Sequence, residues 1–250
     1  MNQLENSHIS ARTAIAGHSA RPASEARGGP GLAYACAWTL LKLYNLVCIG
    51  EIRARGQAGL PDGPKIIAAN HPNATDGFVL PFVFPNERLS CLAQANLFDI
   101  PVLGRWLAGA GAIPAVRGRP DSVLAAAQRR LKQGYSLYIC PEGRLNQGGA
   151  LGRGHTGAVR LALSSGAPIV PVGFYVPPRS VRTFSRNAGG RVHIGRWQVG
   201  GPIYVEIGEA WWPGRELPDR PKGGDYRRLT DQLMDRIAAL ALRAEARARL

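Results

Sequence analysis

Short apolar runs alternate with longer segments of helical periodicity along most of this chain. The apolar runs predict strands, and the periodic segments predict helices. In chain order the predicted elements are strand 65–70, helix 75–84, strand 89–94, a short helix near 100–108, helix 121–133, strand 135–140, helix 156–165 and strand 168–175. This alternation is typical of a single-domain α/β sandwich with a largely parallel sheet flanked by helices.

The last quarter of the chain continues the same domain. Two further apolar runs, 191–199 and 202–207, predict additional strands. A final helix over 226–249 carries Leu229, Leu233, Ile237 and Leu240 on one face. Four large apolar residues at helical spacing indicate a stripe that packs on the core.

The N-terminal 50 residues differ from the rest in composition. Residues 1–31 contain few large apolar side chains and end in a glycine- and proline-rich stretch, so burial cannot offset their ordering entropy. We therefore expect a disordered tail over 1–31. Residues 51–250 are long enough to form one domain with a sizeable core.

Residues 32–50 are apolar and aromatic, but Thr39, Lys42 and Asn45 interrupt them at a spacing of three. On a helix these positions form one narrow polar stripe. An N-terminal membrane-interface helix would leave that stripe in water and place the leucines toward the acyl chains. A spanning helix or a helix packed on the core would also fit this pattern, although Lys42 and Asn45 would be costly in hydrocarbon.

Charge narrows the set of partners. The chain has 31 Lys and Arg against 17 Asp and Glu, a formal net charge of +14, so its surface attracts anions such as acidic lipid or the polyphosphate of coenzyme A. No nucleic acid is expected, because few aromatics lie among the arginines and no zinc-finger spacing is present. The four cysteines form no C-x-x-C pair, so no metal is expected.

One stretch carries candidate chemistry. His71 follows the predicted strand 65–70, and Asp76 comes five residues later, after a break at Pro72 and Asn73. A turn there would let the carboxylate of Asp76 fold back onto the imidazole. A histidine held in one tautomer in this way is suited to act as a general base.

Four segments, taken in order, resemble the motif blocks of the glycerolipid acyltransferase family. These are residues 70–77, 111–117, 138–144 and 166–172, with sequences NHPNATDG, GAIPAVR, YICPEGR and GAPIVPV. The best-known members of that family are the 1-acylglycerol-3-phosphate O-acyltransferases. The likeness runs from about residue 32 to the C-terminal helix, which identifies residues 51–250 as the expected acyltransferase domain.

The resemblance implies an enzyme of phospholipid biosynthesis that moves a fatty acyl group from acyl-CoA or acyl-carrier protein to a lysophospholipid hydroxyl. The acceptor would be a lipid such as 1-acylglycerol-3-phosphate. The enzyme would be membrane-associated, on the cytoplasmic face of an anionic bilayer, and would need no cofactor or metal. His71 would be the catalytic base and Asp76 would orient it. The expected substrate-binding residues are Arg117, Glu142, Gly143 and Arg144.

The third block departs from the family pattern. It usually reads P-E-G-T-R, whereas here Arg144 follows Gly143 directly. The acceptor could therefore be another lysolipid or a glycolipid.

Two alternatives concern the chemistry itself. The acyl group could pass through an acyl-enzyme on Cys140, or the chain could be a non-catalytic basic protein that binds membranes or nucleic acid. A serine esterase lacks its signal, because the chain has no G-x-S-x-G motif.

Overall fold

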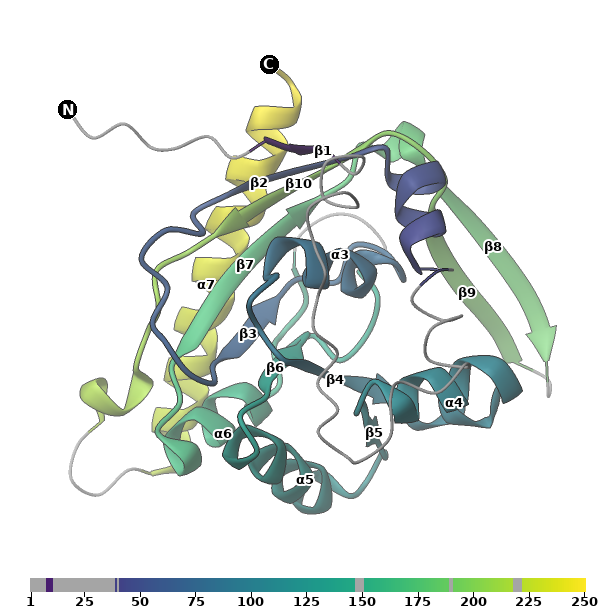
Figure 1. Cartoon of the computed structure of the whole chain (residues 1–250). Coiled ribbons are helices and arrows are strands. Elements are labelled where there is room, and N and C mark those ends of the chain that lie inside the picture. The colour runs from purple at the N-terminus through teal and green to yellow at the C-terminus, as the bar shows by residue number, and fades with distance from the viewer. Residues whose placement is uncertain (1–7, 11–38, 40, 147–150, 189–190, 218–221) are drawn as a thin grey trace.

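The computed structural model describes residues 8–10, 39, 41–146, 151–188, 191–217 and 222–250 (Figure 1). Within these residues, eight strands form one sheet in the order β1-β2-β10-β7-β3-β6-β4-β5. Five neighbours are mutually parallel: β7 (Ile169–Tyr175), β3 (Ile66–Ala69), β6 (Ser136–Ile139), β4 (Leu89–Gln94) and β5 (Ile113–Ala115). The predicted α/β sandwich with a largely parallel sheet is confirmed.

The other edge of the sheet is mixed. β10 (Pro202–Ile207) runs antiparallel to β7, and β2 (Glu51–Arg55) pairs with β10 in parallel. β1 (His8–Ser10) then adds to β2 in antiparallel register. Residues 8–10 thus depart from the predicted disordered tail, while the rest of 1–31 lies outside the described residues.

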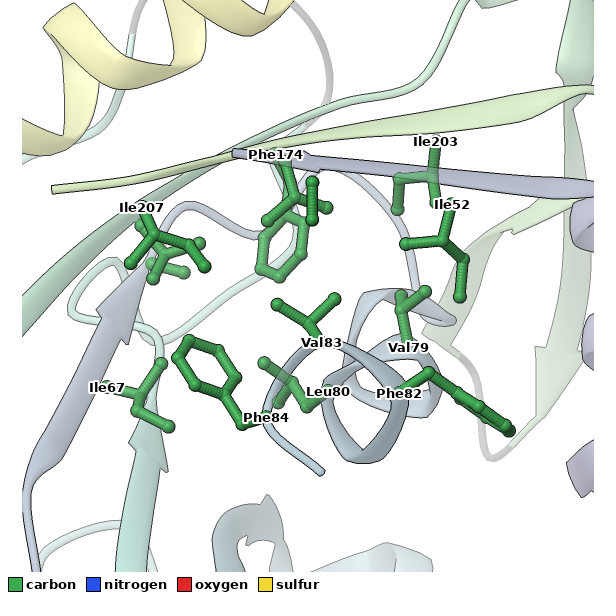
Figure 2. Close-up of a cluster of buried hydrophobic side chains, with 14 of the residues drawn as sticks. Ile52, Ile67, Val79, Leu80, Phe82, Val83, Phe84, Phe174, Ile203 and Ile207 are labelled. Carbon is green, nitrogen blue, oxygen red and sulfur yellow. The ribbon is translucent and has the colours of Figure 1, made fainter. Parts of the chain in front are cut away.

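Helices cover both faces of the sheet (Figure 1). α3 (Asp76–Val83) lies on one face, where Leu80 and Val83 pack with Ile67 and Phe174 (Figure 2). The opposite face is covered by α5 (Pro120–Lys132), α6 (Gly157–Ser165) and α7 (Gly223–Ala248). The predicted stripe of α7 is confirmed, because Leu229, Leu233, Ile237 and Leu240 are all buried.

Shorter elements complete the described chain. After β4 come the 3₁₀ turn η2 (Ala95–Asp99) and α4 (Pro101–Gly109). β8 (Val181–Ala188) and β9 (Arg191–Gln198) form a separate antiparallel hairpin, which extends away from the main sheet (Figure 1). The remaining turns are η3 (Pro178–Ser180) and η4 (Pro213–Glu216).

The predicted membrane-interface helix is described only from residue 39 onward, and its last turn is the π-helix η1 (Asn45–Ile49). The expectation that Asn45 stays in water is wrong. Asn45 is buried, and its amide donates hydrogen bonds to the carbonyls of Leu41 (2.9 Å) and Phe78 (3.3 Å). This face packs on the core, and the two bonds explain how a polar side chain can be accommodated there.

The opposite face of this segment is apolar and exposed, with Leu43, Leu46 and Val47 on it. Among the helices that the structure describes, none combines the length and the hydrophobicity needed to cross a bilayer.

Candidate active site

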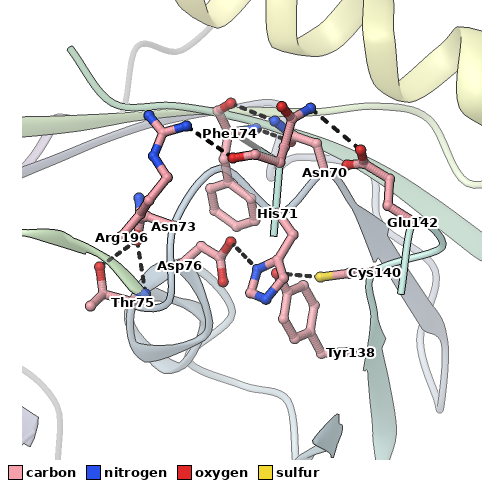
Figure 3. A network of polar contacts seen from close by, with 11 residues as sticks. Asn70, His71, Asn73, Thr75, Asp76, Tyr138, Cys140, Glu142, Phe174 and Arg196 are labelled. Carbon is pink, nitrogen blue, oxygen red and sulfur yellow. Dashed lines mark hydrogen bonds and ion pairs between the residues drawn. The ribbon is translucent and has the colours of Figure 1, made fainter. Parts of the chain in front are cut away.

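The central pair of the site is His71 with Asp76. β3 ends at Ala69, the chain turns, and α3 begins at Asp76, so the acidic side chain points back at the imidazole (Figure 3). His71 Nδ1 lies 2.7 Å from Asp76 Oδ2. The carboxylate is 1% exposed, whereas the imidazole is 26% exposed. A buried acid thus orients the ring through Nδ1, and Cys140 interacts with the same ring.

Polar residues around the pair fix the turn. Asn70 bridges β3 to β7: its side chain accepts from the Phe174 backbone N–H (2.7 Å) and donates to the Phe174 carbonyl (2.9 Å). Asn73 Oδ1 accepts from the backbone N–H (2.8 Å) and the hydroxyl (2.5 Å) of Thr75. In these hydrogen bonds, the side chains of Asn70 and Asn73 replace the backbone groups that would otherwise pair in a sheet or a turn. They hold the backbone on both sides of His71.

The environment changes the acid–base properties of His71. Burial works to lower the pKa of the imidazole, but the interactions with Asp76 and Cys140 outweigh it, so the pKa of His71 is raised to about 11. The environment therefore favours the imidazolium, and the base form of His71 becomes available only as the pH rises toward that pKa.

Cys140 lies at the end of β6, close to the same ring. Burial raises the pKa of its thiol, against the lowering influence of His71, and its sulfur donates to the hydroxyl of Tyr138 (3.1 Å). A raised pKa disfavours the thiolate that an acyl-enzyme would need. Cys140 also packs against the hydrophobic core, which favours a packing role for it.

Glu142 follows β6 at the same edge of the sheet, as expected, but its carboxylate faces its own loop. Oε2 accepts from the Gly152 backbone N–H (2.9 Å) and from the Asn146 side chain (3.3 Å), and the residue is buried. Through Oε2, the carboxylate joins the two ends of the loop from 142 to 152. Oε1 is buried without a hydrogen-bond partner among the described residues, and the contact of Glu142 with an acceptor hydroxyl or Arg144 stays a prediction.

Gly143 has a structural reason to be glycine. Its φ is +65°, and a Cβ there would lie 3.0 Å from the ring of His155. Both facts exclude a side chain without strain.

A second loop residue ties Glu142 to His71. The Asn146 backbone N–H donates to the His71 carbonyl (2.7 Å), while its side chain reaches Glu142. Arg196, on β9, donates to the Asn146 carbonyl (3.0 Å), and its own carbonyl accepts from the Ala74 backbone N–H (2.8 Å). The His71 turn, the Glu142 loop and the hairpin are therefore linked in one network (Figure 3).

The two arginines expected to bind phosphate are both exposed. Arg117 follows β5, at the carboxyl edge of the sheet that also carries His71. Three strand spacings, roughly 14 Å, separate β5 from β3 across the sheet. Arg144 lies beside Gly152, whose added Cβ would be 3.5 Å from its guanidinium. Neither arginine touches the His71–Asp76 pair through a contact that the structure describes.

Sequence reasoning missed Asn70, Asn146 and Arg196. Asn70 stands immediately before His71 in the first motif block, and its position at the end of an apolar run was a usable signal. Asn146 and Arg196 carry no such signal, because only the folded chain brings residues 50 positions apart into contact.

Comparison with known proteins assigns this sequence to a family. The family model named Acyltransferase matches residues 51–175. A 1-acyl-sn-glycerol-3-phosphate acyltransferase of Pseudomonas aeruginosa is 30% identical over 188 residues, 72% of this chain and 68% of that protein. The chloroplastic 1-acyl-sn-glycerol-3-phosphate acyltransferase LPAT1 of Arabidopsis thaliana is 27% identical over 140 residues, 54% of this chain and 38% of that protein. The chain thus spans about two fifths of the length of the plant relatives that it matches.

A solved structure shares the fold. The 1-acyl-sn-glycerophosphate (LPA) acyltransferase PlsC from Thermotoga maritima superposes with a TM-score of 0.55 at 20% identity, over 78% of this chain and 71% of that one. The matched family region begins at β2 and contains His71, Asp76, Arg117 and the Glu142 loop. By its sequence, this chain belongs to the Acyltransferase family.

Proposed function

We propose that this protein transfers a fatty acyl group from acyl-CoA or acyl-carrier protein to a hydroxyl of a lysophospholipid such as 1-acylglycerol-3-phosphate. The observation that carries the proposal is the 2.7 Å contact between His71 Nδ1 and the buried carboxylate of Asp76. The names of the relatives add support, because they are 1-acyl-sn-glycerol-3-phosphate acyltransferases.

His71 is the general base in this reaction. Its Nε2 takes the proton of the acceptor hydroxyl as the oxygen attacks the thioester carbonyl. The new O–acyl bond forms, the C–S bond breaks, and the imidazolium returns the proton to the departing thiolate. Asp76 keeps the imidazole in the correct tautomer and stabilises the imidazolium between these steps.

Arg117 and Arg144 are the candidate ligands for acceptor phosphate, because a guanidinium can grip two phosphate oxygens at once. Both are exposed and lie in loops that follow strands of the parallel sheet. Glu142 and Gly143 shape the loop that carries Arg144 and are further candidates for contact with the acceptor.

The formal charge of +14 supports an anionic membrane, on its cytoplasmic face, as the place of action. Each basic residue near such a surface contributes about 1 kcal/mol to binding. Lysophospholipid acceptors reside in that surface, so docking would bring enzyme and acceptor together.

Thiol release from acyl-CoA, measured with and without 1-acylglycerol-3-phosphate, tests the proposal. The wild type should release thiol only with an acceptor, and His71→Ala should lose about 10² to 10⁴ in rate. Mass measurement of the product across a panel of lysolipids and glycolipids names the acceptor. A protein that binds anionic vesicles but never consumes thioester would be a non-catalytic binder instead.

A further inference from the structure

The β8–β9 hairpin has one face turned toward the site and one turned to solvent. In its register, Thr183 pairs with Arg196 and Val181 with Gln198. Arg196 bonds the active-site loop, Gln198 is fully buried, and Val181 packs on the core. Strand alternation then places the intervening residues on the opposite face.

That outer face is aromatic and exposed. It carries Arg182 paired with Trp197, and Phe184 paired with Gly195. Phe184 is 58% exposed and Trp197 is 38% exposed. A Cβ on Gly195 would lie 2.8 Å from the indole nitrogen of Trp197, so the indole covers this glycine, beside Phe184.

The hairpin is joined to the N-terminal segment, residues 41–49, which carries exposed apolar side chains. The Tyr44 hydroxyl donates to the Gln198 carbonyl (2.5 Å), which joins the helical residues before η1 to the end of β9. Leu43, Leu46 and Val47 are exposed on that segment. Figure 1 shows the segment and the hairpin on the same side of the molecule.

The charge of the hairpin region has one sign. Residues 176–199 contain five arginines and no aspartate or glutamate. Arg179 and Arg182 are exposed there. Exposed Trp and Phe flanked by arginine suit the boundary of an anionic bilayer, where the rings enter the headgroup region and the guanidinium groups meet phosphate.

We propose that the outer face of the β8–β9 hairpin, formed by Arg182, Phe184 and Trp197, inserts into the headgroup region of an anionic membrane. It would form a second contact beside the N-terminal segment. The proposal rests on the membrane association proposed above. Because Arg196 on the inner face holds the His71 and Glu142 loops, the hairpin would dock the catalytic site directly against the lipid surface that supplies the acceptor.

Flotation of the full chain with vesicles of phosphatidylcholine and phosphatidylglycerol tests this. Phe184→Ser/Trp197→Ser should weaken vesicle partitioning about tenfold. Leu242→Ser is the matched control, since Leu242 is an exposed leucine on α7, and it should bind like the wild type. Phe184→Ser alone should give a smaller loss and provides a second test if the double variant is unstable.

A kinetic arm separates this inference from the proposed function. With a short-chain, water-soluble acceptor, the double variant should match the wild type, while with acceptor in vesicles its rate should fall in step with binding. Equal vesicle binding by the wild type and the double variant would overturn the role of the hairpin, whatever the enzyme's activity. The role of the hairpin would also be overturned if the double variant lost binding to single-stranded DNA while its vesicle binding stayed unchanged. The outer face would then be a stacking surface for nucleic acid.

Discussion

At the residue scale, the buried carboxylate of Asp76 affects both the orientation and the pKa of the His71 imidazole. Asp76 orients His71 by the Nδ1 contact and raises its pKa against the effect of burial. Both effects come from the same 2.7 Å contact, but they have different kinetic consequences. Orientation sets the maximal rate, and the pKa sets the pH at which the base form exists.

Asp76→Asn should separate the two effects. In the wild type, His71 becomes a free base only as the pH rises through its raised pKa, so the acid limb of the kcat/KM profile should lie above pH 6.5, the ordinary value. Without the carboxylate that pKa falls, and the limb should move about 1 unit or more toward lower pH. The maximal rate should also drop. Asp62→Asn, an exposed aspartate before β3, should change neither quantity.

Glu142 offers a second test at this scale. Because its carboxylate accepts hydrogen bonds from Gly152 and Asn146, Glu142→Gln keeps one acceptor oxygen and should retain most of the activity. Glu142→Ala leaves the Gly152 N–H without its partner and should cost about 1 to 3 kcal/mol in the free energy of unfolding. Chemical denaturation and initial rates measure both. A Gln variant as inactive as the Ala variant would mean that the charge itself acts on substrate.

At the element scale, close backbone approach sets how α7 lies on the sheet. Gly173 in β7 faces Leu240 and Ala241 of α7, and a Cβ there would overlap the helix backbone. Gly173→Ala should therefore destabilise the fold by about 1 to 3 kcal/mol through overpacking. Gly157→Ala is the control, because a Cβ at residue 157 meets nothing within 4 Å. Urea unfolding of both variants measures the difference, and equal midpoints would contradict this packing.

Among the strands, those buried on both sides give the clearest signal in the sequence. Residues 66–69 are fully buried, so β3 appears as an uninterrupted apolar run. β2 was missed because only Ile52 and Ala54 face the core, between charged residues. β8 was missed because residues 182–185 are exposed on both faces and show no apolar alternation, and β5 because three residues are too few to show a period.

In the candidate site, too, some contacts could be predicted from the sequence and others could not. The His71–Asp76 contact follows from local turn chemistry, five residues apart in one loop, and the sequence could indicate it. The hydrogen-bond partners of Glu142 could not be predicted, because they depend on how its own loop folds back to bring Asn146 and Gly152 to the carboxylate. The same holds for Asn45, whose burial depends on the Phe78 carbonyl.

At the scale of the whole molecule, the excess of basic residues should act as a long-range attraction to anionic surfaces. Binding to phosphatidylglycerol-containing vesicles should fall steeply as salt rises from about 50 to 500 mM, because the Debye length shrinks severalfold. Vesicles of phosphatidylcholine alone serve as the control, with weak binding that changes little with salt. Strong, salt-independent binding to both vesicle types would show that apolar insertion dominates over charge.

In the proposed reaction, His71 removes the proton from an acceptor hydroxyl while an acyl thioester is consumed. The most direct measurement is acceptor-dependent thiol release by the wild type and by a folded His71→Ala variant, with the acylated product identified by mass. The wild type should form one acylated lysolipid per thiol released, and the rate of the variant should be about 10² to 10⁴ lower. A variant that forms the same product at the wild-type rate would contradict it.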